Sequence, residues 1–268
     1  MDNYTFDKFI KKIKRVDAQI FVLTHKKADV KDNLLFTPIL GGAAASHIFD
    51  YDLRDDLGEN ISYLNSLYCE NTSTYWIFKH MNDPRLKYIG QCAYRRMFDI
   101  DEYTDFDKIF KDYDIILPKA LVCGDGTIID NYKEWHSLSD LEDMFGLIEE
   151  KYPDYKEDIV KFREQTTLYN GNAFIMKRED YIAYCEFLFP LASEWLIRHN
   201  ISNLADVDKY VSKKFRNGEY QKFDIEEEAI YYQKRIIGFL SERVLNVFIL
   251  HNFKNIFITP VTLTETNY

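Results

Sequence analysis

The sequence feature that most restricts the fold is a compact apolar run near the start of the chain. Residues 18–23 read Ala-Gln-Ile-Phe-Val-Leu, and Thr24, His25 and Lys26 follow directly. A short run that is apolar on both sides is typical of a parallel strand buried between layers of helices. Polar residues just after such a strand lie at the carboxyl edge of the sheet, where open α/β sheets bind ligands. We therefore expect an α/β fold with a ligand site near residues 24–26.

Strand-like and helix-like segments alternate along the rest of the chain, which also favours the α/β class. Apolar and turn patterns predict strands at residues 34–40, 88–92, 112–118, 172–176 and 255–260, and helices at 68–80, 138–151, 155–165, 178–197 and 231–251. Gly41-Gly42 predicts a turn, and Gly124-Asp125-Gly126 predicts a hairpin-like turn within residues 122–129. The charged residues 203–228 predict an irregular, mobile loop over the site.

The length of 268 residues suits one large α/β domain, which we expect to span residues 18–268. Residues 1–17 would form an N-terminal amphipathic helix. Within residues 4–16, one helical face carries four apolar side chains, namely Phe6, Phe9, Ile10 and Ile13. Such a helix docks on its own domain or lies on a membrane surface, and the sequence leaves both readings open.

Charge and targeting signals exclude several classes of protein. The formal net charge is −10, whereas nucleic-acid-binding proteins carry a basic face. No secretory signal opens the chain, and no apolar stretch is long enough to span a membrane. The four cysteines form no Cys-x-x-Cys pair. We expect a cytoplasmic protein with reduced thiols and no nucleic-acid partner, with peripheral contact to the inner face of the membrane as an option through residues 4–16.

Two arginines directly follow the strand predicted at residues 88–92. Arg95 and Arg96 come after Tyr94 and would stand at the carboxyl edge of the sheet. A guanidinium binds phosphate in a bidentate manner and stays charged, so the pair could hold a diphosphate. Adjacent residues in an extended segment point to opposite sides, so we expect one of the two to face the site. The alternative is that both pair with surface carboxylates.

The polar segment from Asp55 to Ser62 supplies candidates for binding ribose and sugar hydroxyls, in particular Asp56, Gly58 and Asn60. Just before it, Asp50-Tyr51-Asp52 matches the Asp-x-Asp pattern with which nucleotide-sugar enzymes bind metal. Asp50 and Asp52 are therefore candidate ligands for Mn²⁺ or Mg²⁺. Whether a divalent metal is used stays open, and we expect no tightly bound cofactor.

Two carboxylates in apolar helical segments are the candidate catalytic groups. Glu242 lies beside Arg243 inside the helix predicted at residues 231–251, where a charge is unusual unless it is paired or functional. Glu242 could be the general base, with Arg243 offsetting charge on the leaving diphosphate. The alternative is a buried structural ion pair. Glu70 and Tyr75 could face a sugar from the helix predicted at residues 68–80.

The common signatures of other enzyme classes are missing. His25 and His136 are candidate site residues, but neither has a catalytic partner at a recognisable spacing, so a hydrolase triad lacks support. The chain also has no Gly-x-Ser-x-Gly, Walker or Gly-x-Gly-x-x-Gly motif. Serine hydrolase, P-loop and classical dinucleotide-binding readings are therefore disfavoured.

Seven segments taken in order resemble a known family, the bacterial capsule and O-antigen glycosyltransferases that were catalogued as a domain of unknown function and include galactofuranosyltransferases. The most telling are AspAspLeuGlyGluAsnIleSer at 55–62, TyrCysGluAsnThrSerThrTyrTrpIlePheLys at 68–79 and IleGlyGlnCysAlaTyrArgArgMetPhe at 89–98. The others are the segments 20–26, 113–118, 172–177 and 238–246. The resemblance covers residues 18–260.

The resemblance implies a GT-A-like open sheet with flanking helices and a Rossmann-like core that binds a nucleotide sugar. It implies transfer of a sugar from a nucleoside-diphosphate donor, a UDP-sugar such as UDP-galactofuranose, to a growing saccharide that is lipid-linked in some systems. The donor would contact Thr24, His25, Lys26, Asp56, Gly58, Asn60, Arg95 and Arg96. Glu242 and Glu70 would be catalytic, and the acceptor or sugar contacts would be Tyr75, His136, Asn172 and Arg243.

One departure from the family pattern concerns Ala93, which stands where the family usually has a histidine before Tyr-Arg-Arg. Residues 119–137 also depart from the pattern, so the acceptor pocket would differ. If that histidine contacts donor or metal, this chain has altered specificity or weaker activity. Ala93 gives weight to a second reading, a non-catalytic partner subunit of a polysaccharide-assembly complex. A sugar nucleotidyltransferase on a similar fold is a third reading.

Overall fold

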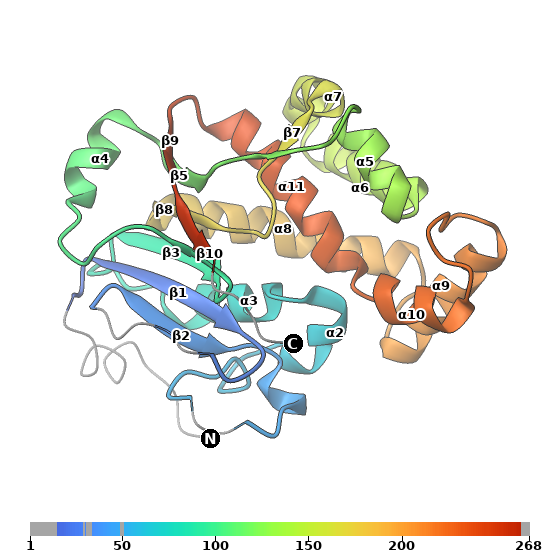
Figure 1. Ribbon diagram of the computed structural model, residues 1–268, viewed down its shortest axis with the longest axis horizontal. Helices are drawn as coiled ribbons and strands as arrows, with labels where there is room; N and C mark the ends of the chain where they lie inside the picture. The colour runs from blue at the N-terminus through green and yellow to red at the C-terminus, as the bar shows by residue number, and fades with distance from the viewer. Residues whose placement is uncertain (1–14, 29, 31–33, 49–50, 264–268) are drawn as a thin grey trace.

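A computed structural model describes residues 15–28, 30, 34–48 and 51–263 of the chain (Figure 1). Most of the helix predicted at residues 4–16 lies outside the described residues. Asp50 lies outside them as well. The centre of the fold is a six-stranded sheet with the order β2-β1-β3-β8-β5-β9. Its strands are β1 (Ala18–Thr24), β2 (Phe36–Leu40), β3 (Tyr88–Ala93), β5 (Ile115–Pro118), β8 (Phe174–Lys177) and β9 (Ile256–Thr259).

The sheet is mixed, with one reversed strand. β1 pairs in parallel with β2 and with β3, and β5 pairs in parallel with β9. β8 lies between β3 and β5 and is antiparallel to both. All strands except β8 therefore end at one edge of the sheet, and β8 begins at that same edge. This topology brings residues that precede β8 next to residues that follow β3 and β5.

The apolar side chains on both faces of β1 explain why this strand lies inside the sheet. All seven of its residues are buried. Phe21 and Leu23 belong to the larger apolar cluster, which includes the helices, whereas Ile20 and Val22 belong to the smaller cluster on the other face. Successive side chains of a strand point to opposite faces, so a strand that is covered on both faces must be apolar throughout. The predicted α/β fold with a buried first strand is confirmed.

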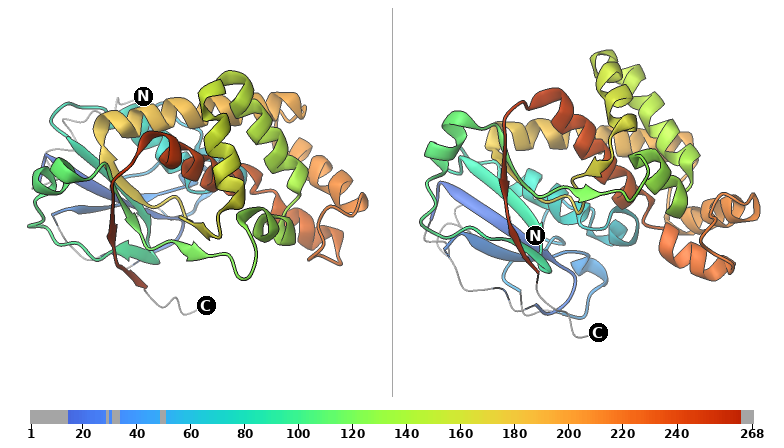
Figure 2. Two further views of the ribbon diagram at one scale, coloured as in Figure 1. Left: turned by 90° about the horizontal axis from the view of Figure 1, so that it is seen from above. Right: turned by 45° about the horizontal axis from the view of Figure 1, so that its top comes forward.

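Helices cover the sheet and extend beyond it on one side. α3 (Asn71–His80), α8 (Arg178–Arg198) and α11 (Ile236–Asn252) pack against one another and the larger cluster, and α4 (Phe106–Asp112) supplies Phe106 and Phe110 to the smaller cluster. Figures 1 and 2 show further helices gathered beside α11, away from β1 and β2. These are α5 (Ile128–Trp135), α6 (Leu138–Lys151), α7 (Lys156–Glu164), α9 (Leu204–Arg216) and α10 (Glu226–Gln233).

The helix predicted at residues 68–80 is interrupted. α2 (Asn65–Tyr68) ends before Cys69, and α3 starts at Asn71. Cys69 has a φ of 52°, a left-handed conformation that a non-glycine residue rarely adopts and that cannot continue a right-handed helix. The interruption places Glu70 at the amino end of α3, as its N-cap residue.

The mobile loop predicted at residues 203–228 is wrong, because this region contains α9 and the start of α10. The Asn203 side chain caps α9 by accepting hydrogen bonds from two backbone amides. Val207 and Val211 lie on the buried face of this helix together with Lys214, which pairs with Asp140, while most of the other charged residues form the solvated face. The helix predicted at residues 231–251 is also divided, since α10 ends at Gln233 and α11 begins at Ile236.

The turn predicted at Gly124-Asp125-Gly126 forms, but it does not join two strands of a hairpin. β6 (Leu121–Val122) pairs with the distant β7 (Thr167–Leu168), and α5 follows directly with a capping box between Thr127 and Asp130. A second small ribbon joins β4 (Arg96–Phe98) to β10 (Val261–Leu263). The 3-10 turns are η1 (Ala43–Ala45), η2 (Ser62–Leu64) and η3 (Pro153–Tyr155).

Candidate functional site

A group of basic side chains surrounds Tyr94 at the carboxyl edge of the sheet. Leu23 is the partner of Ala93 across β1 and β3, so the two chains leave the sheet side by side. The ring of His25 lies edge-on to the ring of Tyr94, with 5.6 Å between centroids. The Lys26 ammonium and the Arg95 guanidinium lie 5.7 and 5.4 Å from the same ring centroid. The structure thus brings together residues that the sequence predicted to bind the donor.

The electrostatics of this group favour an anion. The pKa of His25 is lowered by partial burial and by the nearby charges of Arg95 and Lys26. A neutral imidazole at pH 7 leaves Lys26 and Arg95 as like charges on one aromatic ring, and a bound anion would relieve their repulsion. Thr24 differs from its neighbours, since it is buried and its hydroxyl donates to the Lys26 carbonyl, which fixes the turn after β1.

The turn at residues 170–172, just before β8, connects Arg96, the residue that follows Arg95, to both candidate carboxylates. Asn170 accepts a hydrogen bond from the guanidinium of Arg96, at 3.1 Å. The backbone N–H of Gly171 donates to Glu242 at 2.9 Å. Asn172 donates through its side-chain amide to Glu70 at 2.7 Å. Three consecutive residues therefore place one arginine and two carboxylates around a single turn.

Asn172 is the most constrained residue of this turn. It is fully buried, and its φ of 46° is left-handed. Its amide nitrogen also donates to the hydroxyl of Ser241 at 3.0 Å, and its carbonyl accepts from the side chain of Gln91 at 2.8 Å. Within the described part of the chain, its buried Oδ1 atom has no hydrogen-bond partner, and neither has the Oδ1 atom of Asn71. A buried polar network of this kind holds its members in one geometry.

The two carboxylates differ in their surroundings. Burial raises the pKa of Glu70, and the negative charge of Glu242 raises it further. The side chain of Glu242 is 21% exposed and forms an ion pair with Arg243 at 2.8 Å. Arg243 is itself buried and lies over the ring of Tyr132, with 4.8 Å to the centroid. Glu70 therefore holds a proton more readily than an ordinary glutamic acid does, while Glu242 reaches solvent beside a fixed positive charge.

The predicted sugar-binding residues of the loop at 55–62 contact one another. Asp56 forms a bidentate ion pair with Arg54, at 3.0 and 2.7 Å. The side-chain amide of Asn60 donates to the carbonyl of Gly58 at 2.8 Å and to that of Asp56 at 3.1 Å. Gly58 has a φ of 64°, and a Cβ atom there would lie 2.6 Å from the His80 ring. These contacts shape the loop from within.

Asp55 is the residue of this loop that sequence reasoning did not single out. It is fully buried and accepts hydrogen bonds from the backbone N–H groups of Gly42 and Ala43, at 2.9 and 3.0 Å. The hydroxyl of Ser62 donates to the same carboxylate at 2.5 Å. Because Gly42 and Ala43 follow β2, Asp55 fixes the chain where it leaves the carboxyl edge of the sheet. Asp55 lies 13 residues after Gly42 and 12 after Ala43 in the sequence, so no local pattern signals this role.

Two predicted acceptor contacts lie outside the group around residues 170–172. The hydroxyl of Tyr75 donates to Glu59 at 2.8 Å, and its ring packs edge-on against Phe189 of α8. His136 is buried, with Nδ1 2.9 Å from Gln233 and its ring 4.1 Å from that of Phe239. Burial, followed by the charge of Arg243, lowers the pKa of His136 to about 3. His136 is thus a neutral member of an aromatic layer.

The described residues show no donor set for a divalent metal. Asp52 is exposed, and its predicted partner Asp50 lies outside the described residues. Across the described ranges, no three side chains of His, Cys, Asp or Glu converge in a way that could hold a metal ion. The same part of the chain contains no helix that is long and apolar enough to cross a membrane.

Sequence reasoning also missed Asn170, Gly171 and Ser241. The Asn-Gly-Asn run before a predicted strand is a turn signal, because these residues tolerate positive φ. That signal could have located the turn, although its contacts to three distant segments depend on the fold.

Comparisons with known proteins agree with this architecture. Residues 19–215 match the family described as "Domain of unknown function (DUF4422)". No curated protein sequence matches the chain. Among solved structures, the chain is similar to the apo structure of the WbbM bifunctional glycosyltransferase, with a TM-score of 0.72 and 23% identity. The match covers 93% of this chain and 46% of the other, so this chain spans less than half the length of that protein. At this identity the likeness establishes the shared fold.

Proposed function

This chain belongs to the DUF4422 family and shares the fold of a glycosyltransferase, and from this we propose that it transfers a sugar from a nucleoside-diphosphate donor to a saccharide acceptor. The donor we propose is a UDP-sugar, with UDP-galactofuranose as the first candidate. The proposed acceptor is the growing saccharide of a bacterial capsule, exopolysaccharide or O-antigen. WbbM is described as a bifunctional glycosyltransferase, and the shared fold makes one such activity the natural starting point.

One observation carries the proposal: cations with no acidic partner among the described residues gather at the carboxyl edge of the sheet, and the turn that holds two carboxylates reaches the same edge. Lys26 and Arg95 form no ion pair within the described residues and meet on the ring of Tyr94. Glu70 and Glu242 are held by the adjacent turn. Sugar transfer from a nucleoside diphosphate needs both elements, since the leaving group is a diphosphate anion and the nucleophile is a hydroxyl that loses its proton.

In the proposed reaction, an acceptor hydroxyl attacks the anomeric carbon of the donor sugar as the bond to the diphosphate breaks. Glu242 takes the hydroxyl proton, because it is paired with Arg243 and partly exposed, whereas the raised pKa of Glu70 makes that residue hold its own proton more readily. Lys26 and Arg95 stabilise the negative charge that develops on the diphosphate. Glu70, with its raised pKa, would donate a hydrogen bond to a sugar hydroxyl when protonated and accept one from it when ionised. A single displacement of this kind inverts the anomeric configuration.

The first test is a thermal-shift screen with UDP-, GDP-, CMP- and dTDP-sugars, with and without Mn²⁺. A ligand that binds only the native state raises the melting temperature. We expect one nucleotide class to stabilise the wild type and to stabilise Arg95→Gln less. Arg216→Gln, which removes an exposed arginine paired with Glu226, is the matched control and should behave like the wild type.

The released product then separates the competing functions. A glycosyltransferase releases a nucleoside diphosphate when donor and acceptor are mixed, whereas a nucleotidyltransferase releases pyrophosphate. If a nucleotide sugar binds but neither nucleoside diphosphate nor pyrophosphate is released, the result would favour the non-catalytic partner subunit. Ala93, which replaces the histidine of the family pattern, is the sequence feature that supports this alternative. The proposal is contradicted if a folded wild-type protein is stabilised by no nucleotide sugar under any of these conditions.

A further inference from the structure

The arginines of this protein divide into two groups by their partners. The chain has eleven arginines in a sequence with 44 acidic residues, and all eleven lie within the described ranges. Eight of them are within 4 Å of a carboxylate. The three that have no carboxylate partner among the described residues are Arg95, Arg96 and Arg235. Arg95 and Arg96 already belong to the candidate site, so Arg235 is the unexplained member.

Arg235 is held in place from one side only. It stands between α10 and α11, and its guanidinium lies over the rings of Tyr232 and Phe239, at 4.4 and 5.1 Å to the centroids. Its Nε atom donates to the carbonyl of Tyr232 at 3.2 Å. Its two terminal nitrogens donate to no group in the described part of the chain. A guanidinium that is stacked flat and tethered at Nε presents its outer edge for bidentate binding.

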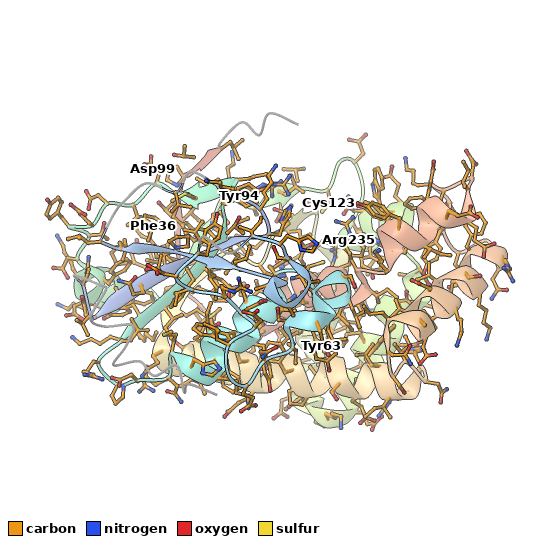
Figure 3. All side chains as sticks on the ribbon, turned by 90° about the horizontal axis from the view of Figure 1, so that it is seen from below. Phe36, Tyr63, Tyr94, Asp99, Cys123 and Arg235 are labelled. Atoms are coloured by element: carbon orange, nitrogen blue, oxygen red, sulfur yellow. The ribbon has the colours of Figure 1, made fainter. Side chains whose placement is uncertain are left out.

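The position of Arg235 at the start of α11 directs it toward the site. Arg235 is the N-cap residue of α11 and comes two turns before Glu242. Gly238, one turn after Arg235, approaches Cys69 so closely that an added Cβ atom would lie 2.6 Å from its sulfur. Cys69 directly precedes Glu70, so this end of α11 packs against the Glu70 segment. Figure 3 shows Arg235 at the boundary between the sheet and the helices beside it.

The charge of Arg235 also acts on this part of the site. Its positive charge opposes the rise in the pKa of Glu70 that burial and Glu242 cause. Arg235 thus contributes positive charge near Glu70 from the helical side.

We propose that Arg235 is an anion-binding residue of the candidate site, which takes a phosphate group of a substrate from the helical side. This inference rests on the proposed function, because it assigns the anion to that reaction. Two substrates could supply the phosphate. One is the diphosphate of the donor, and the other is the phosphate of a lipid-linked acceptor. A guanidinium can bind either phosphate in a bidentate manner. The arginines that already pair with carboxylates are not needed for this contact.

The experiment measures affinities by isothermal titration for wild type, Arg235→Gln, Arg235→Lys and the control Arg216→Gln. The probes are UDP, GDP, uridine, pyrophosphate and the soluble prenyl analogue geranyl diphosphate. We expect Arg235→Gln to weaken binding of a phosphate-bearing probe about tenfold or more, which corresponds to losing one charged hydrogen-bonded contact. Arg235→Lys should recover part of that loss, and Arg216→Gln should bind like the wild type.

The pattern of losses identifies the source of the phosphate. Weaker binding of UDP or GDP assigns Arg235 to the donor, and weaker binding of geranyl diphosphate alone assigns it to the acceptor. The proposal is overturned if the wild type binds no phosphate-bearing probe, or if Arg235→Gln binds every probe with unchanged affinity. Failure of the proposed function alone looks different: nucleotide sugars are not turned over, while pyrophosphate binding still depends on Arg235.

Discussion

Glu70 and Glu242 accept hydrogen bonds from adjacent residues of one turn, although they lie in distant parts of the sequence. Asn172 donates to Glu70 at 2.7 Å, and the backbone of Gly171 donates to Glu242 at 2.9 Å. The turn comes just before the one reversed strand of the sheet, which is why it reaches the carboxyl edge. The relative position of the two carboxylates therefore depends on this short connection.

The first prediction concerns proton removal. Glu242→Gln keeps the size of the side chain and can still accept the hydrogen bond from Gly171, but it cannot take a proton. We expect the transfer rate to fall by about 10²-fold or more, the range for a general base, while UDP or GDP binding stays near that of the wild type. Initial rates of nucleoside diphosphate release check this. Glu228→Gln, an exposed change in α10, is the control, and equal rates for Glu242→Gln and wild type would remove Glu242 from the mechanism.

The second prediction concerns the close approach of α11 to Cys69. In Gly238→Ala the new methyl group would lie 2.6 Å from the Cys69 sulfur, so the better helix propensity of alanine is outweighed by overpacking. We expect the free energy of unfolding to fall by about 1–2 kcal/mol in urea denaturation. Gly146→Ala is the matched control, because its methyl group meets no atom within 4 Å, and it should be neutral or stabilising.

A second substitution shows whether that loss comes from Cys69. Cys69→Gly removes the sulfur and also suits the left-handed φ of 52°. We expect the double variant Gly238→Ala/Cys69→Gly to be more stable than the sum of the single changes predicts. Simple additivity of the two effects would show that the two residues do not clash.

The third prediction concerns the buried carboxylate of Asp55. Asp55→Asn replaces one acceptor oxygen with an NH₂ group that faces N–H or O–H donors. Leaving a buried donor unsatisfied costs about 1–3 kcal/mol, so we expect the melting temperature to fall clearly. Because the loop after β2 would loosen at the edge of the sheet, nucleotide binding should weaken as well. The exposed change Asp224→Asn should alter neither quantity, and an unchanged melting temperature for Asp55→Asn would contradict this account.

The fourth prediction concerns pH. The folded protein lowers the pKa of His136 from 6.5 to about 3, so the unfolded chain binds the proton more tightly. The stability that neutral His136 provides is therefore fully present above pH 6.5 and is lost as the pH falls toward 3. At pH 5 this group alone should reduce the free energy of unfolding by about 2 kcal/mol relative to pH 7.

The measurement compares the pH dependence of stability in variants rather than their absolute stability. His136→Gln cannot be protonated, so its free energy of unfolding should change less between pH 7 and pH 5 than that of the wild type. His47→Gln, at an exposed position, should keep the dependence of the wild type. Identical pH dependence in His136→Gln and wild type would mean that His136 is not buried in the neutral form.

Local patterns in the sequence determined the elements whose signal is apolar and short in range. The run at 18–23 predicted a buried strand because a strand covered on both faces has to be apolar, and β1 is such a strand. Residues 138–151 predicted α6 from helical periodicity, and the structure has the same bounds. Strand ends also predicted the location of His25, Lys26 and Arg95, because parallel strands share one carboxyl edge.

Only the tertiary structure decided which polar residues meet. The left-handed φ of Cys69 has no sequence signal, and the close approach of α11 at Gly238 brings together two segments far apart in the chain. The partners of Asp56 and Asn60 lie within or beside their own loop. Arg235 has no acidic partner among the described residues and stands at the start of α11. Apolar periodicity reports burial of one segment at a time. A charged side chain, by contrast, acts through whatever the fold places beside it, and that depends on contacts between segments far apart in the chain.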